Sequence, residues 1–339
     1  MLRKAFLKGA ATGAAFLSLG ATGGARAQTI NGAGATFPAP IYQKWFADFH
    51  AANPGVTFNY QPVGSGQGIA YYKAGTVFFG ASDAPMIDAD LNGVQPTLQI
   101  PTVAGAVVLA YNIPGFTGSL KLSPDVVADI YLKRIKSWDD PRIKRDNPTV
   151  PAAPIVVVHR SDGSGTTNIF TNYLAAVSRD WAGGPGIGKT VSWPAGVGGN
   201  GNPGVANLIR SQRGAIGYIE LTYALENWIG YAALKNAAGA WVEPSIASTA
   251  AAVEAGAGRL RSDVRNTIVN GPGRKTYPIV GLTFLLVPKS PRDKAQGRAL
   301  VSFLKWAMGP GQAEAEKMNY GRLSAALINN NFKALNGVR

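Results

Sequence analysis

The segment Arg160-Ser161-Asp162-Gly163-Ser164-Gly165-Thr166-Thr167 brings a guanidinium group together with hydroxyl and glycine residues. Arg160 can donate two parallel hydrogen bonds to an oxyanion, and Ser164 and Thr166 add hydroxyl donors. Asp162 is close enough in sequence to hold Arg160 in orientation. A strand is expected before the segment and a helix after it, so N–H groups at the helix start add donors and a favourable dipole. These residue types predict an anion-binding loop. A capped helix with an Asx turn is the ordinary structural alternative.

Two further segments place glycine and hydroxyl residues where a helix is expected to begin. In Ala33-Gly34-Ala35-Thr36-Phe37 a Gly-rich turn enters a helix, and in Gly64-Ser65-Gly66-Gln67-Gly68 a strand leads into one. Glycine lets backbone N–H groups approach a ligand closely, and Thr36 and Ser65 add hydroxyl donors. With the loop at Arg160, the chain therefore carries three potential clusters of hydrogen-bond donors.

Asp83 follows a short expected strand and differs from the other candidates because a carboxylate repels an anion. The residue fits an anion site only if the anion carries a proton that the carboxylate can accept. Phosphate near neutral pH carries at least one P–OH group, whereas sulfate carries none and would face an unpaired carboxylate. Asp83 therefore favours phosphate among tetrahedral oxyanions.

Alternating short strands and helices are expected to place these loops at strand ends, where α/β proteins bind ligands. Apolar residues at Ile41, Trp45 and Phe49 predict an amphipathic helix that ends near Asn53-Pro54-Gly55. The other expected strands are 56–61, 77–81, 103–111, 155–158 and 277–287, and the other expected helices are 69–74, one from 124, 166–177 and 299–308. A helix and a strand over 205–219 are expected to lead into an Ala-rich helical region up to about Arg261. This alternation predicts an α/β fold with mainly parallel sheets.

Two glycine motifs imitate nucleotide-binding loops. Gly183-x-x-x-x-Gly188-Lys189-Thr190 matches the P-loop pattern, but a P-loop needs a strand before it and a helix after it. Here a helix precedes and an extended segment closed by Pro194 follows. Gly199-x-Gly201-x-x-Gly204 with Glu220 imitates a dinucleotide fingerprint, but Pro194 interrupts the strand that should run into its first glycine. We therefore interpret the second motif as a structural Gly-rich loop.

Residues for covalent or metal chemistry are few. The chain has no cysteine, which excludes disulfides, thiolate zinc sites, a cysteine nucleophile and iron–sulfur clusters. Its two histidines, His50 and His159, form no pair at metal-ligand spacing, and we interpret both as surface or structural residues. We therefore expect no metal site, no cofactor and no catalytic activity.

The 339 residues carry 33 Lys and Arg against 19 Asp and Glu, a formal net charge of +14. This balance is compatible with nucleic acid, an anionic membrane surface or an acidic ligand, and charge alone does not choose among them. Glycine, with 42 residues, is well above its usual share of about 7%. The length predicts two domains, at about 100–200 residues each.

The N-terminal segment has the features of an export signal. Arg3, Lys4 and Lys8 precede an apolar run of small residues, and Ala25-Arg26-Ala27 has the form of a signal-peptidase site. Removal of residues 1–27 leaves 29 basic and 19 acidic residues, a net charge of +10. Without cysteine we expect no lipid anchor, so the mature chain is predicted to be periplasmic. The residues around Lys4 also resemble a twin-arginine signal, which leaves the export route open.

The sequence resembles the exported phosphate-binding proteins of high-affinity phosphate ABC importers. The matching segments are Gly32-Ala33-Gly34-Ala35-Thr36-Phe37-Pro38-Ala39-Pro40, Gly64-Ser65-Gly66, Phe79-Gly80-Ala81-Ser82-Asp83-Ala84-Pro85, Ile130-Tyr131-Leu132, Ser137-Trp138-Asp139-Asp140, Arg160-Ser161-Asp162-Gly163-Ser164-Gly165-Thr166 and Gly214-Ala215-Ile216-Gly217-Tyr218. They span nearly the whole chain after residue 27, in order. Ser161, where the family often has alanine, and Gln67 are minor departures.

The resemblance implies a two-lobed periplasmic-binding-protein fold of type II-like form, with each lobe a mainly parallel sheet flanked by helices. It places lobe 1 at 28–106 plus 275–339 and lobe 2 at 107–274, joined by hinge strands near Val103 and Tyr277. The implied phosphate-binding residues are Ala35, Thr36, Phe37, Ser65, Asp83, Arg160, Asp162, Ser164, Gly165 and Thr166. In this scheme Arg160 clamps the anion and pairs with Asp162, Asp83 accepts the phosphate proton, and the others donate or shape the loops.

The predicted function is to bind inorganic phosphate in a dehydrated cleft and to deliver it to the permease subunits of an ABC importer. We expect a monomer that does not bind nucleic acid. Three alternatives remain open at this point: a receptor for another tetrahedral oxyanion such as sulfate, a secreted phosphatase, and a nucleic-acid binder. A buried pocket is screened by salt much less than a polyanion-binding surface, which separates the last alternative from the others.

Overall fold

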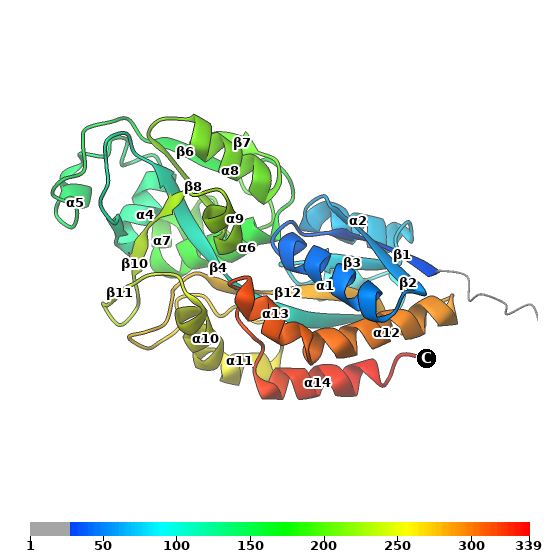
Figure 1. The fold of residues 1–339 in the computed structure, drawn as a ribbon. Coiled ribbons are helices and arrows are strands. Elements are labelled where there is room, and N and C mark those ends of the chain that lie inside the picture. Colours follow the sequence, from blue (N-terminus) through cyan, green and yellow to red (C-terminus); the bar gives the residue numbers. More distant parts are fainter. Residues whose placement is uncertain (1–27) are drawn as a thin grey trace, which may run out of the picture.

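A computed structural model describes residues 28–339, and the predicted signal peptide lies outside these residues (Figure 1). Most strands belong to one sheet with the order β2-β1-β3-β12-β4-β8-β6-β7, and β9 pairs with β4. A second sheet has the order β11-β10-β5. Figure 1 shows two bodies, with β4 and β12 running below and between them.

The first body is built around three parallel strands, β1 (Gln28–Gly34), β2 (Val56–Pro62) and β3 (Phe79–Ser82). Helix α1 (Ala39–Ala52) buries Ile41, Trp45 and Phe49 against the sheet, as the spacing of these residues predicts. Helices α2 (Ser65–Ala74) and α12 (Lys294–Met308) flank the same body. An aromatic cluster forms its core, in which the rings of Phe58 and Phe303 lie 4.8 Å apart.

The second body contains the parallel strands β6 (Val156–Arg160), β7 (Val197–Gly199) and β8 (Ala215–Glu220). Helix α6 (Gly165–Val177) follows β6, and helix α8 (Gly201–Ser211) follows β7. Each helix therefore begins within a few residues of the carboxyl end of a strand. That arrangement directs the N–H groups at the helix starts toward the space between the bodies.

Two long strands connect the bodies. Strand β4 (Thr97–Asn112) pairs antiparallel with β12 (Val280–Pro288) through Ala106 and with β8 from Val107 onward. The outer strands are thus parallel, as the alternating pattern predicts, while the connecting strands add antiparallel pairs. The register of β12 shifts between Thr283 and Phe284, which interrupts the ladder beside the space between the bodies.

The remaining elements complete the surface of both bodies. They are α3 (Asp88–Leu91), β5 (Lys121–Leu122), α4 (Pro124–Tyr131), α5 (Pro141–Lys144), α7 (Arg179–Gly183), α9 (Leu221–Glu226), β9 (Gly230–Tyr231), β10 (Ala233–Lys235), β11 (Trp241–Val242), α10 (Ile246–Ala255), α11 (Ala257–Ser262), α13 (Gly311–Lys317) and α14 (Ala325–Leu335). Among residues 28–339, no helix is long and apolar enough to cross a membrane.

Two sequence-based expectations were wrong. The Ala-rich region up to Arg261 is not continuously helical, because β9, β10 and β11 separate α9 from α10. Pro194 does not prevent a strand from entering the Gly199 motif either: β7 begins at Val197, after the proline, and α8 begins two residues beyond Gly199. The motif is therefore a strand–turn–helix unit whose strand has only three residues. No helix begins directly after Lys189-Thr190, because residues 191–196 are irregular and the next helix is α8 at Gly201, in agreement with the expected context of the P-loop-like segment.

Candidate functional site

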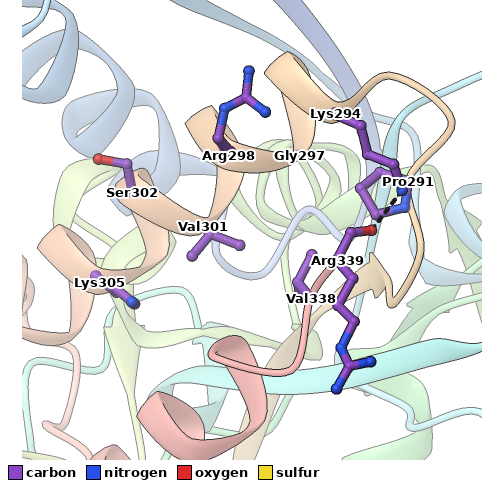
Figure 2. A pocket seen from close by; sticks show the side chains of 9 residues that line it. All are labelled: Pro291, Lys294, Gly297, Arg298, Val301, Ser302, Lys305, Val338 and Arg339. Atoms are coloured by element: carbon purple, nitrogen blue, oxygen red, sulfur yellow. Dashed lines mark hydrogen bonds between the residues drawn. The ribbon is translucent and has the colours of Figure 1, made fainter.

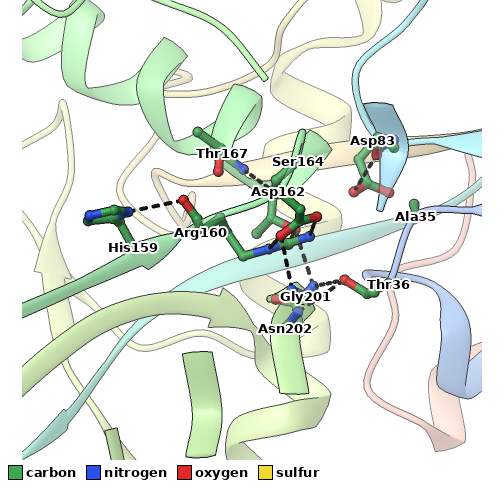
Figure 3. A network of polar contacts seen from close by, with 12 residues as sticks. Ala35, Thr36, Asp83, His159, Arg160, Asp162, Ser164, Thr167, Gly201 and Asn202 are labelled. Atoms are coloured by element: carbon green, nitrogen blue, oxygen red, sulfur yellow. Dashed lines mark hydrogen bonds and ion pairs between the residues drawn. The ribbon is translucent and has the colours of Figure 1, made fainter. Parts of the chain in front are cut away.

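The carboxyl ends of the parallel strands from both bodies meet at one place. β1, β3, β6 and β7 end immediately before the segments that contain Thr36, Asp83, Asp162 and Asn202. Figure 3 shows Thr36 and Asp83 from the first body facing Arg160, Asp162 and Asn202 from the second. Most of the polar side chains here are almost completely buried, among them Thr36, Ser65, Asp83, Arg160, Ser164, Thr166 and Asn202. We call this cluster the cleft site.

The guanidinium of Arg160 is held by the neighbouring carboxylate. Its Nε donates to Asp162 Oδ1 at 2.7 Å, and its Nη2 donates to Asp162 Oδ2. Its Nη1 donates to Thr166 Oγ1 at 3.3 Å. These bonds use three of the five guanidinium N–H groups, so two remain for a ligand. The expected orientation of Arg160 by Asp162 is confirmed, with the side chain of Arg160 only 1% exposed.

Asp162 is charged and connects two loops. Burial opposes ionisation of Asp162, but its hydrogen bonds to Arg160 outweigh that effect and keep the pKa of Asp162 below its ordinary value. Its Oδ1 also accepts a hydrogen bond from the Gly201 N–H group at 3.0 Å. The carboxylate therefore fixes the start of α8 relative to the guanidinium.

The start of α6 supplies further donors. The Ser164 hydroxyl accepts a hydrogen bond from the Thr167 N–H group at 3.0 Å and caps the helix. The Ser164 N–H group donates to the Lys189 carbonyl, so Ser164 can offer a ligand only its hydroxyl hydrogen. The N–H groups of Gly165 and Thr166 lie in the first turn of α6, where the helix provides no acceptor.

The two bodies approach each other closely at Gly165. A Cβ atom on this residue would lie 2.5 Å from both the Cβ of Asp83 and the Oγ of Ser65, distances that no side chain tolerates. The Gly66 N–H group also donates to the Gly163 carbonyl at 2.7 Å, across the two bodies. Glycine is therefore required at position 165 for the bodies to meet in this way.

Three tyrosines orient the loop of the first body. The hydroxyls of Tyr60, Tyr223 and Tyr320 donate to the carbonyls of Ala35, Thr36 and Phe37 at 2.7, 2.6 and 2.8 Å. Burial raises the pKa values of the three tyrosines above the ordinary value, so they remain neutral donors. These bonds hold three successive carbonyls, and within the described residues the N–H groups of Thr36 and Phe37 have no backbone acceptor.

Ala35 differs from its neighbours. Its N–H group donates to the Ala81 carbonyl at 2.9 Å, and its carbonyl accepts from Tyr60. Both backbone groups of Ala35 therefore have partners within the protein. The part that Ala35 can take in the expected phosphate site is therefore to shape the loop.

Asp83 is 4% exposed, and its nearest hydrogen-bond partners are neutral hydroxyl groups. Thr283 Oγ1 donates to its Oδ1 at 2.8 Å, and Ser65 Oγ lies 3.5 Å from its Oδ2. Burial raises the pKa of Asp83 to about 7, although the hydrogen bond from Thr283 and the charge of Arg160 act in the opposite direction. The carboxyl can therefore accept a proton in the neutral pH range.

Sequence reasoning missed Asn202, Thr283 and the three tyrosines. Asn202, at the start of α8, donates to both Thr36 and Thr166. A signal was available for Thr283, the only polar side chain in the apolar strand Val280–Pro288. For Asn202 the signal was the strand–turn–helix context of its glycine motif, which Pro194 hid.

Each of the two histidines places Nδ1 near a backbone carbonyl. His50 Nδ1 lies 2.8 Å from the Val56 carbonyl on the surface, and His159 Nδ1 lies 3.0 Å from the Arg160 carbonyl. The His159 ring also stacks on Trp193, with ring centroids 5.0 Å apart. Within residues 28–339, His, Asp and Glu side chains form no group of three or more that could hold a metal ion.

Comparisons with known proteins agree on one family. The family model of the PBP superfamily domain matches residues 20–310. The chain is 43% identical over 302 residues to the phosphate-binding protein PstS of Xylella fastidiosa, covering 88% of this chain and 82% of that protein. It is 40% identical over 315 residues to the PstS protein of Haemophilus influenzae, with 92% and 94% covered. The chain belongs to the PstS phosphate-binding protein family.

A solved structure shares the fold of this PstS family member. It is a high-affinity periplasmic phosphate-binding protein bound with phosphate, with a TM-score of 0.74, 24% identity, and coverage of 92% of this chain and 99% of that chain. The predicted two-lobed α/β fold is thereby confirmed. The names of the PstS relatives describe binding proteins rather than enzymes.

Proposed function

We propose that this protein binds inorganic phosphate at the cleft site and delivers it to the permease of a phosphate ABC importer, without catalysis of its own. The observation that carries the proposal is the composition of the site. One guanidinium with two N–H groups to spare, several neutral donors and one proton-accepting carboxyl lie together, and all of them are buried. The PstS relatives, at 40–44% identity, support the same ligand.

The proposed contacts follow from donors that have no other acceptor, together with the Ser65 hydroxyl, which also lies within reach of Asp83 Oδ2 at 3.5 Å. Arg160, Ser65, Ser164 and Thr166 donate from their side chains, together with the backbone N–H groups of Thr36, Phe37, Gly165 and Thr166 and the hydroxyl of Thr36. Asp83 accepts the P–OH hydrogen, and Asp162 orients Arg160. A buried anion needs all its lone pairs occupied, because an unpaired buried charge costs tens of kcal/mol by Born estimates.

The two bodies form the proposed lobes, with lobe 1 at 28–106 plus 275–339 and lobe 2 at 107–274. The change of partner along β4, from β12 to β8 after Ala106, supports this division. Because the donors come from both lobes, closure about β4 and β12 would complete the site. We also propose export to the periplasm with cleavage after Ala27, in a monomeric form.

Titration calorimetry with phosphate and with sulfate tests the proposed function. We expect micromolar or tighter phosphate binding and sulfate binding weaker by at least about 100-fold, because sulfate has no proton for Asp83. Tighter binding of sulfate would contradict the role of Asp83. Turnover of a phosphomonoester under the same conditions would favour a phosphatase instead.

A further inference from the structure

Asn202 forms hydrogen bonds to residues of both bodies within the cleft site. It is fully buried at the second position of α8. Its backbone N–H group and its Nδ2 donate to Thr36 Oγ1 at 3.1 and 3.0 Å, and Nδ2 also donates to Thr166 Oγ1 at 3.2 Å. The side chain thus joins Thr36 of the first body to Thr166 of the second (Figure 3).

The orientation of the Asn202 amide follows from one backbone contact. The Glu220 N–H group lies 2.9 Å from Asn202 Oδ1. A backbone N–H group can only donate, so the amide oxygen must point toward Glu220 and the amide nitrogen toward the two threonines. Both hydrogens of that nitrogen are then used, one for each hydroxyl.

These donations determine what the two hydroxyls can still do. A threonine hydroxyl has one hydrogen and two acceptor lone pairs. Thr36 Oγ1 accepts from the N–H group and from Nδ2 of Asn202, and Thr166 Oγ1 accepts from Asn202 and from Arg160 Nη1. With both lone pairs occupied in each case, each hydroxyl has only its hydrogen left to offer. Both can therefore bind an acceptor and neither can bind a donor.

We propose that Asn202 is a positioning residue that makes Thr36 and Thr166 obligatory donors to the bound anion and links the lobes when they are closed. This inference rests on the proposed phosphate function. Through the Thr36 and Thr166 hydroxyls, Asn202 selects ligand oxygens that carry no proton, and it need not touch the ligand to do so. Asp83 then selects the one protonated oxygen on another side of the same site.

The sharpest test is the Asn202→Asp substitution, which keeps size and shape but replaces two donors by an acceptor. The two hydroxyls would turn their hydrogens toward the new carboxylate and away from phosphate. We expect phosphate binding to weaken by about 100-fold, equal to about 2.8 kcal/mol. Asn207→Asp is the matched control, because Asn207 lies on the same helix but is exposed. This control should change phosphate affinity less than about twofold.

A pH series separates positioning from a merely structural role. As the introduced carboxyl becomes protonated it regains one donor, so the ratio of the Asn202→Asp and wild-type dissociation constants should shrink from pH 8 to pH 5. The charged or titratable groups around position 202 are Arg160, Asp162, Asp83, Glu220, Tyr223 and Tyr320. They are common to both proteins, so their own titration largely cancels in the ratio. A ratio that does not change with pH would contradict the proposal.

The Asn202→Ala substitution keeps the inference testable if the aspartate variant does not fold. It removes the amide donors but leaves the backbone bond to Thr36, so we expect a loss of about 10-fold. Thermal melting of each ligand-free variant verifies folding. If wild type binds phosphate and both Asn202 variants bind it equally well, the inference is wrong and the proposed function stands. If wild type does not bind phosphate, both are wrong.

Discussion

The cleft site and a groove on the surface use positive charge in opposite ways. The groove lies between α12 and the last residues of the chain, has a volume of about 550 Å³, and is lined by Lys294, Arg298, Lys305 and Arg339 (Figure 2). We call it the basic groove. The cleft site has a single cation, Arg160, which is buried and paired with Asp162. The basic groove thus has more positive charge, whereas the cleft site has the directed hydrogen bonds.

The difference lies in what each set of groups can recognise. In the basic groove, Lys294 donates to the backbone oxygen of Arg339, and Lys305 donates to the Asn336 side chain. Exposed charges of this kind are screened by salt and hydrated, so they attract anions without distinguishing them. In the cleft site, hydrogen bonds within the protein determine which donor hydrogens remain free for a ligand. We therefore expect selectivity to depend on hydrogen-bond direction rather than on net charge.

The same substitution in the two regions should have very different effects. Arg160→Met removes two ligand-facing N–H groups and their charge, so we expect phosphate binding to weaken by about 10²–10⁴-fold. Arg298→Met, in the basic groove, should change affinity less than about twofold. Calorimetry measures both effects, and circular dichroism of the ligand-free proteins verifies folding. Comparable losses in the two variants would show that general charge attraction dominates binding.

Asp83→Asn tests whether a carboxyl in the cleft site provides the discrimination that the basic groove lacks. The amide can donate to sulfate, whereas the carboxylate repels it. We expect the ratio of phosphate to sulfate affinity to fall by about 10–100-fold, measured by calorimetry with each anion at pH 8. An unchanged ratio would place selectivity elsewhere in the site.

The same variant should also change stability in a pH-dependent way. Burial raises the pKa of Asp83 to about 7, whereas an unfolded aspartate titrates near about 4. Between these values the folded protein retains a proton that the unfolded chain releases, so the free energy of unfolding falls as pH rises through this window. Asp83→Asn should therefore stabilise the ligand-free protein at pH 8, by at most about 4 kcal/mol, and have little effect at pH 4. Denaturant unfolding measures the free energy of unfolding at pH 4 and pH 8. An equal gain from Asp83→Asn at the two pH values would contradict this expectation.

Salt should have the smallest effect. Because the cleft site is buried, we expect the phosphate dissociation constant to change by less than about threefold between 0.05 and 0.5 M NaCl. Binding of a polyanion to the basic groove would weaken far more over the same range. A steep salt dependence of phosphate binding would mean that the ligand occupies an exposed site.

Local patterns were enough to predict much of the fold and part of the cleft site. The four-residue spacing of Ile41, Trp45 and Phe49 predicted α1, because burial of one helix face depends on spacing alone. The pairing of Arg160 with Asp162 was also predictable, since two residues of separation keep the side chains together. Pro194 misled the prediction of β7, because a strand of three residues can begin after a proline and still enter the glycine motif.

What the amino-acid sequence determined by itself was therefore most of the helices and strands around the site, the family, and the position of the loops at Thr36, Ser65 and Arg160 next to helix starts. Only the tertiary structure decided which hydrogens those donors keep for a ligand. Asn202 reaches Thr36 across 166 residues and Thr283 reaches Asp83 across 200. The physical reason is that hydrogen-bond direction depends on every partner of an atom, and distant partners become neighbours only when the strands of both lobes meet.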